Sequence, residues 1–434
     1  MKTIQKINKH FRQIKNGGIL VIIKKFKSLI VLFLQVPVYL ISIPTIILIR
    51  LIRPWFLIRW HGINSARIGH FASETELYCC EIDSGINKPN QNYVDLFYLS
   101  KKIVSNKQLE RMWRRKIKIF PHFLIYPLFN FNRILDNFFK GGNFHEIGKN
   151  TNSDRDVHNL LEKYSSHINF TQEEEEKGKQ ILNRFDININ KFVCLNVRDS
   201  AYLDRQKKHS NQDWSYHNFR DGDIDLYIPA AEELVKRGYH VFRMGAKVLK
   251  KIKSTNSKII DYANSEMRSE FMDIYLGAKC SFCITTGNGF DEIPRIFRKP
   301  IAWVYVPIGN FLTNNKKDLL ITKNHINKNN NNKLSLSEIF SFNVAFVEKT
   351  EEFKNNNVKL KDNNPKEIRD LVIEMDERLN GSWKETEQDL SLQEKFWKIF
   401  KENIKKQNLD KPIHGTIKAK IGSRYLRENQ DWIR

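Results

Sequence analysis

The sequence predicts an α/β protein whose larger part is a parallel, doubly wound sheet with helices on both faces. Between residues 192 and 306, short runs rich in β-branched and aromatic residues alternate with helical stretches. The chain has 434 residues, of which 41% are hydrophobic and 12% aromatic, so it can form two or three domains with a sizeable core. An apolar run near the N-terminus lies outside this pattern and indicates a separate, membrane-associated segment.

Basic residues are in excess, with 72 Lys and Arg against 49 Asp and Glu and a net charge of +23. Such a surface attracts the phosphates of nucleic acid, anionic lipid or a nucleotide. Residues 1–63 hold eleven of the basic residues and no acid, and the remainder has no nucleic-acid recognition motif, so we expect no nucleic-acid partner. Five cysteines do not indicate a disulfide framework, and we interpret the Cys280–Cys283 pair as part of a buried strand.

The uncharged run covers residues 28–49, which is close to the ~20 residues needed to cross a bilayer. Pro37 and Pro44 favour a kink. Both flanks are basic, which favours a cytoplasmic position for both ends, and Trp55 suits the membrane interface. We therefore expect residues 1–63 to associate with an anionic membrane surface, either spanning the bilayer or lying in it. A buried hairpin of an ordinary core is the alternative.

Residues 64–186 predict a smaller, less regular N-terminal α/β domain. Its expected strands lie near Ala66 and at 93–99, and its expected helices at 107–113, 124–139 and 171–185. Thr171 and Glu174 form a capping box that marks the start of the last helix.

The doubly wound domain is predicted at residues 187–345, and C-terminal helices that pack back on the two domains at 346–434. Its expected strands are 192–197, 239–244, 258–262, 280–285 and 301–306, and its expected helices are 225–237, 267–278 and 289–298. The Asn-rich tract 324–333 predicts a surface loop, and 365–379 and 392–404 predict amphipathic helices.

Ligands of doubly wound sheets lie beyond the carboxyl ends of the strands, so the residues directly after each strand are informative. The fourth strand leads into a Thr-Thr-Gly-Asn-Gly turn and a helix start, where free N–H groups favour a phosphate. Arg243 ends an apolar strand, a costly place for a guanidinium without an anionic partner. Together these features predict a nucleotide diphosphate site formed by Arg198, Tyr202, Arg243, Gly245, Thr285, Thr286, Gly287, Asn288, Gly289 and Glu292.

Several of these segments resemble a family of bacterial glycosyltransferases encoded in surface-polysaccharide gene clusters. The similar segments are residues 196–202 (NVRDSAY), 217–221 (HNFRD), 238–245 (GYHVFRMG), 285–289 (TTGNG) and 421–427 (IGSRYLR) with Asp431 and Trp432. The resemblance covers about residues 67–434 without the Asn-rich tract. The broader relatives of this family are the two-domain, metal-independent GT-B glycosyltransferases.

The resemblance implies two Rossmann-like (GT-B) domains, with the nucleotide-sugar donor in the C-terminal domain and the acceptor in the N-terminal one. The resemblance identifies neither the donor sugar nor the acceptor. For this reaction class we expect a lipid-linked or polysaccharide acceptor, no cofactor, and a location at the cytoplasmic face of the inner membrane. A related glycerol-phosphate-type transferase and a non-catalytic, membrane-tethered scaffold of polysaccharide assembly are the alternatives.

The catalytic base is expected in residues 67–76, where GT-B enzymes commonly place a Gly-containing loop. His70 is the first candidate because an ordinary imidazole has a pKa near ~6.5. Glu74 and Glu76 are rivals if burial raises their pKa, and a structural role for His70 stays open. The one Asp-x-Asp match, at 221–223, precedes a helix where Asp has a capping role, so no metal is expected.

Overall fold

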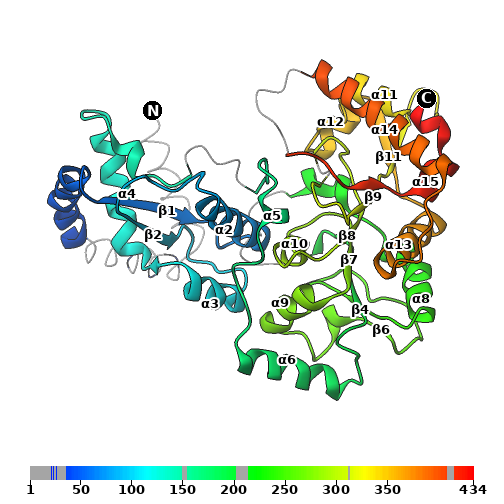
Figure 1. The fold of residues 1–434 in the computed structure, drawn as a ribbon, viewed down its shortest axis with the longest axis horizontal. Helices are drawn as coiled ribbons and strands as arrows, with labels where there is room; N and C mark the ends of the chain where they lie inside the picture. Colours follow the sequence, from blue (N-terminus) through cyan, green and yellow to red (C-terminus); the bar gives the residue numbers. More distant parts are fainter. Residues whose placement is uncertain are drawn as a thin grey trace. The chain divides into compact units, whose positions relative to one another are not determined.

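The computed structural model describes residues 36–148, 154–201, 214–310, 313–407 and 415–434, together with residues 21, 23 and 26. Tyr202 and the first part of the apolar run, residues 28–35, lie outside the described residues. The chain is a mixed α/β protein with two parallel sheets, as predicted (Figure 1). It forms two compact units, which we call unit 1 (Met1–Ile63, Pro89–Ser100 and Ile117–Asn150) and unit 2 (Asn64–Lys88, Lys101–Lys116 and Thr151–Arg434). The units interleave along the chain, whereas the sequence led us to expect consecutive domains.

Unit 2 contains a sheet of seven parallel strands in the order β12-β9-β8-β7-β4-β5-β6. Without β12, the chain order of these strands across the sheet is 6-5-4-1-2-3, the arrangement of doubly wound dinucleotide-binding folds. The five predicted strands are confirmed, although each is shorter than expected. The strands are β4 Phe192–Asn196, β5 His240–Arg243, β6 Ile259–Ile260, β7 Phe282–Thr285, β8 Ile301–Val304, β9 Leu319–Ile321 and β12 Lys420–Ile421.

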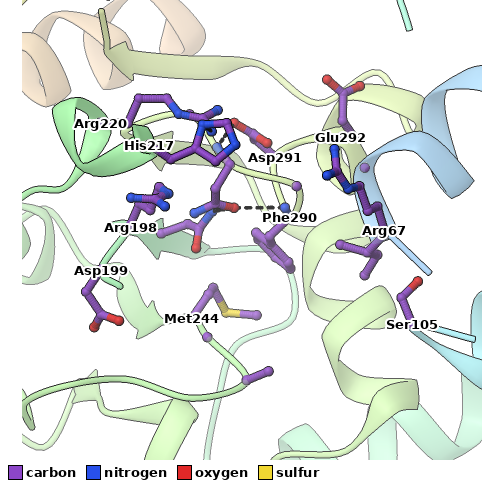
Figure 2. Close-up of a pocket in the computed structure, with 18 of the residues that line it drawn as sticks. Arg67, Ser105, Arg198, Asp199, His217, Arg220, Met244, Phe290, Asp291 and Glu292 are labelled. Carbon is purple, nitrogen blue, oxygen red and sulfur yellow. Dashed lines mark hydrogen bonds between the residues drawn. The ribbon is translucent and has the colours of Figure 1, made fainter. Parts of the chain in front are cut away.

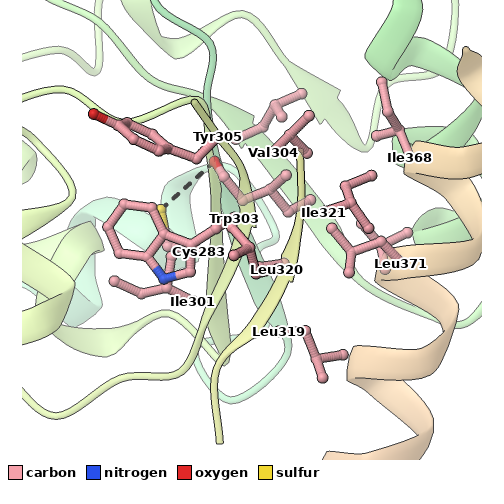
Figure 3. Packing of buried hydrophobic residues seen from close by; sticks show 14 of the residues in the cluster. Cys283, Ile301, Trp303, Val304, Tyr305, Leu319, Leu320, Ile321, Ile368 and Leu371 are labelled. Carbon is pink, nitrogen blue, oxygen red and sulfur yellow. Dashed lines mark hydrogen bonds between the residues drawn. The ribbon is translucent and has the colours of Figure 1, made fainter. Parts of the chain in front are cut away.

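Helices cover both faces of this sheet, with α9 Glu270–Lys279 and α10 Glu292–Ile296 on one side and α8 Ile228–Lys236 and α13 Pro365–Asn380 on the other (Figure 1). Buried side chains of α13 pack on the apolar strands β8 and β9, as Figure 3 shows for Ile368 and Leu371. The strands are buried on both faces, so they are apolar without alternation. Helix α10 is much shorter than the predicted 289–298.

The remaining elements of unit 2 surround this core. Thr171 caps α6 with the predicted capping box. The Asn-rich tract is not entirely a loop, because its first residues form β10, which pairs antiparallel with β11. These elements are α2 Ile68–Asp83, α3 Lys107–Lys116, α5 Leu160–Lys163, α6 Gln172–Arg184, η2 Ser215–Arg220, η3 Ile224–Tyr227, η4 Tyr262–Asn264, β10 Asn324–Asn327, α11 Leu336–Ser341, α12 Thr350–Asn355, β11 Val358–Lys361, α14 Glu387–Lys406, α15 Ser423–Glu428 and η5 Gln430–Ile433.

Unit 1 contains a parallel sheet of β1 Leu57–Ile63, β2 Tyr93–Leu99 and β3 Ile119–Phe120, with α4 His122–Leu135 and η1 Gly142–His145. The prediction of a strand near Ala66 was wrong. The first strand, β1, lies earlier in the chain, within residues 1–63, which the sequence assigned to a membrane-associated segment. Arg59 is accommodated there because Asp95 on β2 accepts two hydrogen bonds of 2.7 Å from its guanidinium. The second Rossmann-like domain of a GT-B enzyme stays a prediction.

The described end of the apolar run is helical over residues 36–52 and belongs to unit 1. Ile46 and Ile49 are buried in a cluster with Trp60 and Tyr98. Within the described ranges, no helix combines the length and apolarity that crossing a membrane requires.

Candidate functional site

A cavity of about 430 Å³ lies at the carboxyl ends of the unit 2 strands. It is centred where β4 and β7 are neighbours, the position at which chain order reverses in the sheet. Doubly wound proteins bind ligands at this switch point because the loops on either side diverge there. All of its lining residues belong to unit 2.

One side of the cavity is strongly basic. Arg198 follows β4 and Arg220 ends η2, and Figure 2 shows both beside His217. Arg220 donates a 2.8 Å hydrogen bond to Nδ1 of His217, and Asp221 forms an ion pair with Arg198. Burial, followed by the charges of Arg220, Arg198 and Arg67, lowers the pKa of His217 to about 3. The imidazole is therefore neutral, and the guanidinium groups of Arg198 and Arg220 lie on the same side of the cavity.

The turn after β7 is held in one conformation by its own side chains. The Thr285 hydroxyl accepts a hydrogen bond from the Gly287 N–H at 3.0 Å, and Asp291 accepts one from the Asn288 N–H at 2.9 Å. Asn288 accepts from Asn196 at 2.7 Å, which ties the turn to the end of β4. These bonds present Gly287, Asn288 and Gly289 to the cavity.

Gly287 is required in this turn for two reasons. Its φ of +80° lies in the left-handed region, which disfavours residues that have a Cβ. A Cβ atom at this position would also lie 1.9 Å from the Tyr305 ring.

Helix α2 approaches the same turn through a second pair of glycines. A Cβ atom on Gly69 would lie 3.1 Å from Cα of Gly289, and one on Gly289 would lie 3.2 Å from the Gly69 nitrogen. This backbone contact brings the start of α2 to the cavity, so that Arg67 and His70 line it. The expected Gly-containing loop is therefore the N-terminal turn of a helix.

His70 is paired with Glu74, one helical turn later, through a 2.8 Å contact between Nδ1 and Oε1. This hydrogen bond raises the pKa of His70 against the opposing effect of burial. Both side chains are partly exposed, at 29% and 22%. The pair is a geometry in which a carboxylate orients an imidazole and fixes its tautomer.

Two acidic side chains also line the cavity, Asp291 beside His217 and Arg220 and Glu292 beside Arg67. Glu292 pairs with Arg295 at 3.0 Å, and burial raises the pKa of Glu292. Burial and the charge of Glu292 raise the pKa of Asp291 to about 8. The cavity thus presents both charge-stabilising and proton-holding groups within one space.

The structure brings many of the predicted site residues together, but it separates others. Arg198, His70, Gly245, Gly287, Asn288, Gly289 and Glu292 line the cavity. Thr285 and Thr286 are buried beneath the turn, where Thr286 accepts a hydrogen bond from the Arg198 backbone N–H at 2.9 Å. Tyr202 is outside the described residues.

Arg243 and Glu76 do not line the cavity. Arg243 is buried as predicted, but its anionic partners are Asp261 at 3.2 Å and Asp199 at 3.7 Å. Arg243 therefore pairs with Asp199, which lines the cavity, while Arg243 itself does not reach the cavity. Glu76 is fully buried and pairs with Arg298 at 2.5 Å and His167 at 3.0 Å.

Sequence reasoning missed several lining residues, above all Arg67, His217, Arg220, Met244 and Phe290. Arg220 and His217 lie in a 3₁₀ segment with no strand or helix periodicity, so the available signal was the resemblance of residues 217–221 to the glycosyltransferase family. Phe290 directly follows the predicted turn, which was the available signal.

Glu76, Cys80 and His167 lie close enough together to bind a metal ion jointly. The guanidinium of Arg298 already lies 2.5 Å from Glu76 and 3.7 Å from Cys80, so it supplies the positive charge there. Asp223, of the Asp-x-Asp match, accepts a hydrogen bond from the Asp225 N–H at the start of η3, which is the capping role expected for it.

The chain matches no family model and no curated protein. Among solved structures it is similar to the glycosyl transferase family 9 from Veillonella parvula DSM 2008, with 10% sequence identity and a TM-score of 0.37. The match covers 59% of this chain and 82% of that chain. This structural similarity is too low to indicate an activity. The activity is inferred below from the cavity and from the sequence.

Proposed function

We propose that this protein is a membrane-associated, metal-independent glycosyltransferase of GT-B type. It would move a sugar from a nucleotide-sugar donor to a lipid-linked or polysaccharide acceptor in bacterial cell-surface glycan synthesis, at the cytoplasmic face of the inner membrane. The observation that carries the proposal is the cavity at the switch point of the unit 2 sheet, with four arginines on its wall. The sequence resemblance to surface-polysaccharide glycosyltransferases supports the same reaction.

The cavity has the size and chemistry that a nucleotide diphosphate needs. Small-molecule sites usually measure ~300 to 1,000 Å³, and this one is about 430 Å³. Arg198 and Arg220 are the groups we expect on the diphosphate, because a guanidinium binds phosphate oxygens with two donors at once. Phe290 and Met244 provide an apolar wall of the kind that a base contacts.

The proposed chemistry uses the two ends of the cavity differently. The His70–Glu74 pair would accept the proton of the acceptor hydroxyl as its oxygen attacks the anomeric carbon. The bond from that carbon to the diphosphate breaks, and the arginines stabilise the charge of the departing nucleoside diphosphate. Fixed donors and charges at the leaving group lower the barrier because they need no reorganisation during the reaction.

A donor screen tests the proposal. The full chain is incubated with UDP-, GDP-, CDP- and ADP-sugars and with CDP-glycerol, and mass spectrometry measures the nucleoside diphosphate released from a nucleotide sugar or the CMP released from CDP-glycerol. We expect one class of nucleotide sugar to raise the melting temperature and to be cleaved slowly. Selective use of CDP-glycerol would favour a glycerol-phosphate-type transferase. Binding of none of these donors at millimolar concentration would contradict the proposal.

A further inference from the structure

Unit 1 exposes an unusual number of large apolar side chains. In the helix of residues 36–52, Leu40, Ile41, Ile47, Leu48 and Leu51 are exposed on the side opposite the buried Ile46 and Ile49. A soluble helix normally presents polar residues on such a face. No charged residue occurs between positions 36 and 49, so this outer face is apolar along its length.

A second set of exposed apolar residues comes from a distant part of the chain. Residues 137–144, which we call the aromatic turn, contain Phe138, Phe139 and Phe144, whose exposed fractions are 77%, 69% and 54%. An exposed Phe is a cost in water, and exposed apolar groups clustered in this way usually mark a contact surface.

Arg50, which lies one helical turn after the buried Ile46 and so on the inner side of the helix, joins the helix to the aromatic turn. Its guanidinium donates to the Phe139 carbonyl at 2.6 Å and to the Asn132 carbonyl at 2.7 Å. Arg53, also on this side of the helix, lies 4.2 Å from the centre of the Phe144 ring. Figure 1 shows the helix in dark blue near α4, which leads into the turn.

The turn itself is ordered by hydrogen bonds, so the Phe side chains are held outward by the fold. Asp136 accepts a 2.7 Å bond from the Gly142 N–H, and Asn132 donates a 2.8 Å bond to the Gly142 carbonyl. A Cβ atom at Gly142 would lie 2.6 Å from the Arg50 guanidinium, so the two segments are in close contact.

The charge of unit 1 indicates what covers this surface. Its segments carry 15 Lys and Arg against three Asp and Glu. Of the three acids, Asp95 is paired with Arg59 and Asp136 lies 3.9 Å from Arg50. Lys140 is exposed within the aromatic turn itself. Two copies of so basic a surface would repel one another, whereas an anionic bilayer attracts it.

We infer that the aromatic turn of unit 1 inserts into the interface of an anionic lipid bilayer. Phe side chains bury in the boundary of the acyl chains, and Arg53 and Lys140 lie at the level of the head groups. The inference shares with the proposed function only the premise that the protein works at a membrane. It adds that a segment remote from the N-terminus holds unit 1 to the lipid.

Vesicle binding of the full chain tests this inference. Vesicles of phosphatidylcholine, with and without about 30% phosphatidylglycerol, are sedimented with wild-type protein and with the Phe138→Ser/Phe139→Ser variant. We expect the double variant to bind anionic vesicles roughly tenfold or more weakly, because two apolar side chains no longer leave water. Lys140→Glu should weaken binding to anionic vesicles and leave binding to neutral ones unchanged.

The matched control is Phe185→Ser/Leu390→Ser, which removes two apolar side chains of unit 2 that are exposed to 52% and 50%. It should bind vesicles like the wild type. Unchanged binding by a folded Phe138→Ser/Phe139→Ser variant would overturn the inference, as would a dimer that this variant dissociates while vesicle binding is unaffected. Donor binding, measured on the same preparations, tests the proposed function separately, since neither Phe lines the cavity.

Discussion

Replacing Arg220 with Ala gives two independent readouts of the proposed diphosphate site. Arg220 lines the cavity and donates to His217 at 2.8 Å, and its charge is the largest electrostatic cause of the low His217 pKa. A lost charged hydrogen bond to the diphosphate costs about 1.5 to 3 kcal/mol, which weakens the donor Kd roughly 13- to 150-fold. The pKa of His217 should rise from about 3 toward the ordinary value.

The pH dependence of stability follows with a definite sign. The pKa of His217 in the folded chain is below the unfolded value near ~6.5, so the unfolded chain binds the proton more readily. Wild-type protein therefore loses stability from this group as the pH falls from ~6.5 toward ~3. Arg220→Ala should bring the pKa of His217 in the folded chain closer to its value in the unfolded chain. The free energy of unfolding should then fall less as the pH is lowered from ~6.5 toward ~3.

Calorimetric titration with the donor and NMR titration of the His217 ring provide the two measurements. Arg237→Ala is the matched control, because it removes a guanidinium of unit 2 that pairs with Asp376 at 2.9 Å and does not line the cavity. The control should leave both the donor Kd and the His217 pKa unchanged. A folded Arg220→Ala variant with wild-type donor affinity would refute the assignment of the diphosphate to this side of the cavity.

Three further predictions concern the approach of α2 to the cavity. His70→Ala should lower turnover ~10²- to 10⁴-fold with little change in donor Kd, and Glu74→Gln should move the acid limb of the pH–rate profile to lower pH, because the hydrogen bond that raises the His70 pKa is weakened. Steady-state kinetics over pH test both, and unaltered turnover in His70→Ala would exclude it as the base. Gly289→Ala would place a Cβ 3.1 Å from Ile68. It should lower the free energy of unfolding by about 1 to 3 kcal/mol, measured by thermal unfolding, and should also reduce turnover. Normal turnover in Gly289→Ala would show that the close contact is dispensable.

The unit 2 sheet could be predicted from sequence because its strands carry a local signal. Each is a short, continuous apolar run buried on both faces, and the intervening helices repeat with helical periodicity. The alternation of strands and helices indicates a parallel sheet, and its strand order comes from the structure. The same reasoning located Arg198 and the 285–289 turn, since both directly follow strands.

The parts that could not be predicted depend on contacts between distant segments. Arg243 was correctly expected to need an anionic partner, but nothing local shows that Asp261 and Asp199 supply it. Arg220 reaches the cavity from a segment without periodicity. Residues 1–63 were expected to form a membrane-associated segment, although their last part, β1 with its paired Arg59, belongs to a sheet. An exposed and a buried apolar residue look the same in sequence.

The most direct test of the central claim is a crystal structure of the protein with the nucleotide sugar that the donor screen identifies, or with its nucleoside diphosphate. We expect density for the diphosphate within hydrogen-bonding distance of Arg198 and Arg220, beside the turn at Gly287–Gly289, with the base against Phe290. A nucleotide bound outside the switch-point cavity, or oriented with its diphosphate away from both arginines, would contradict it.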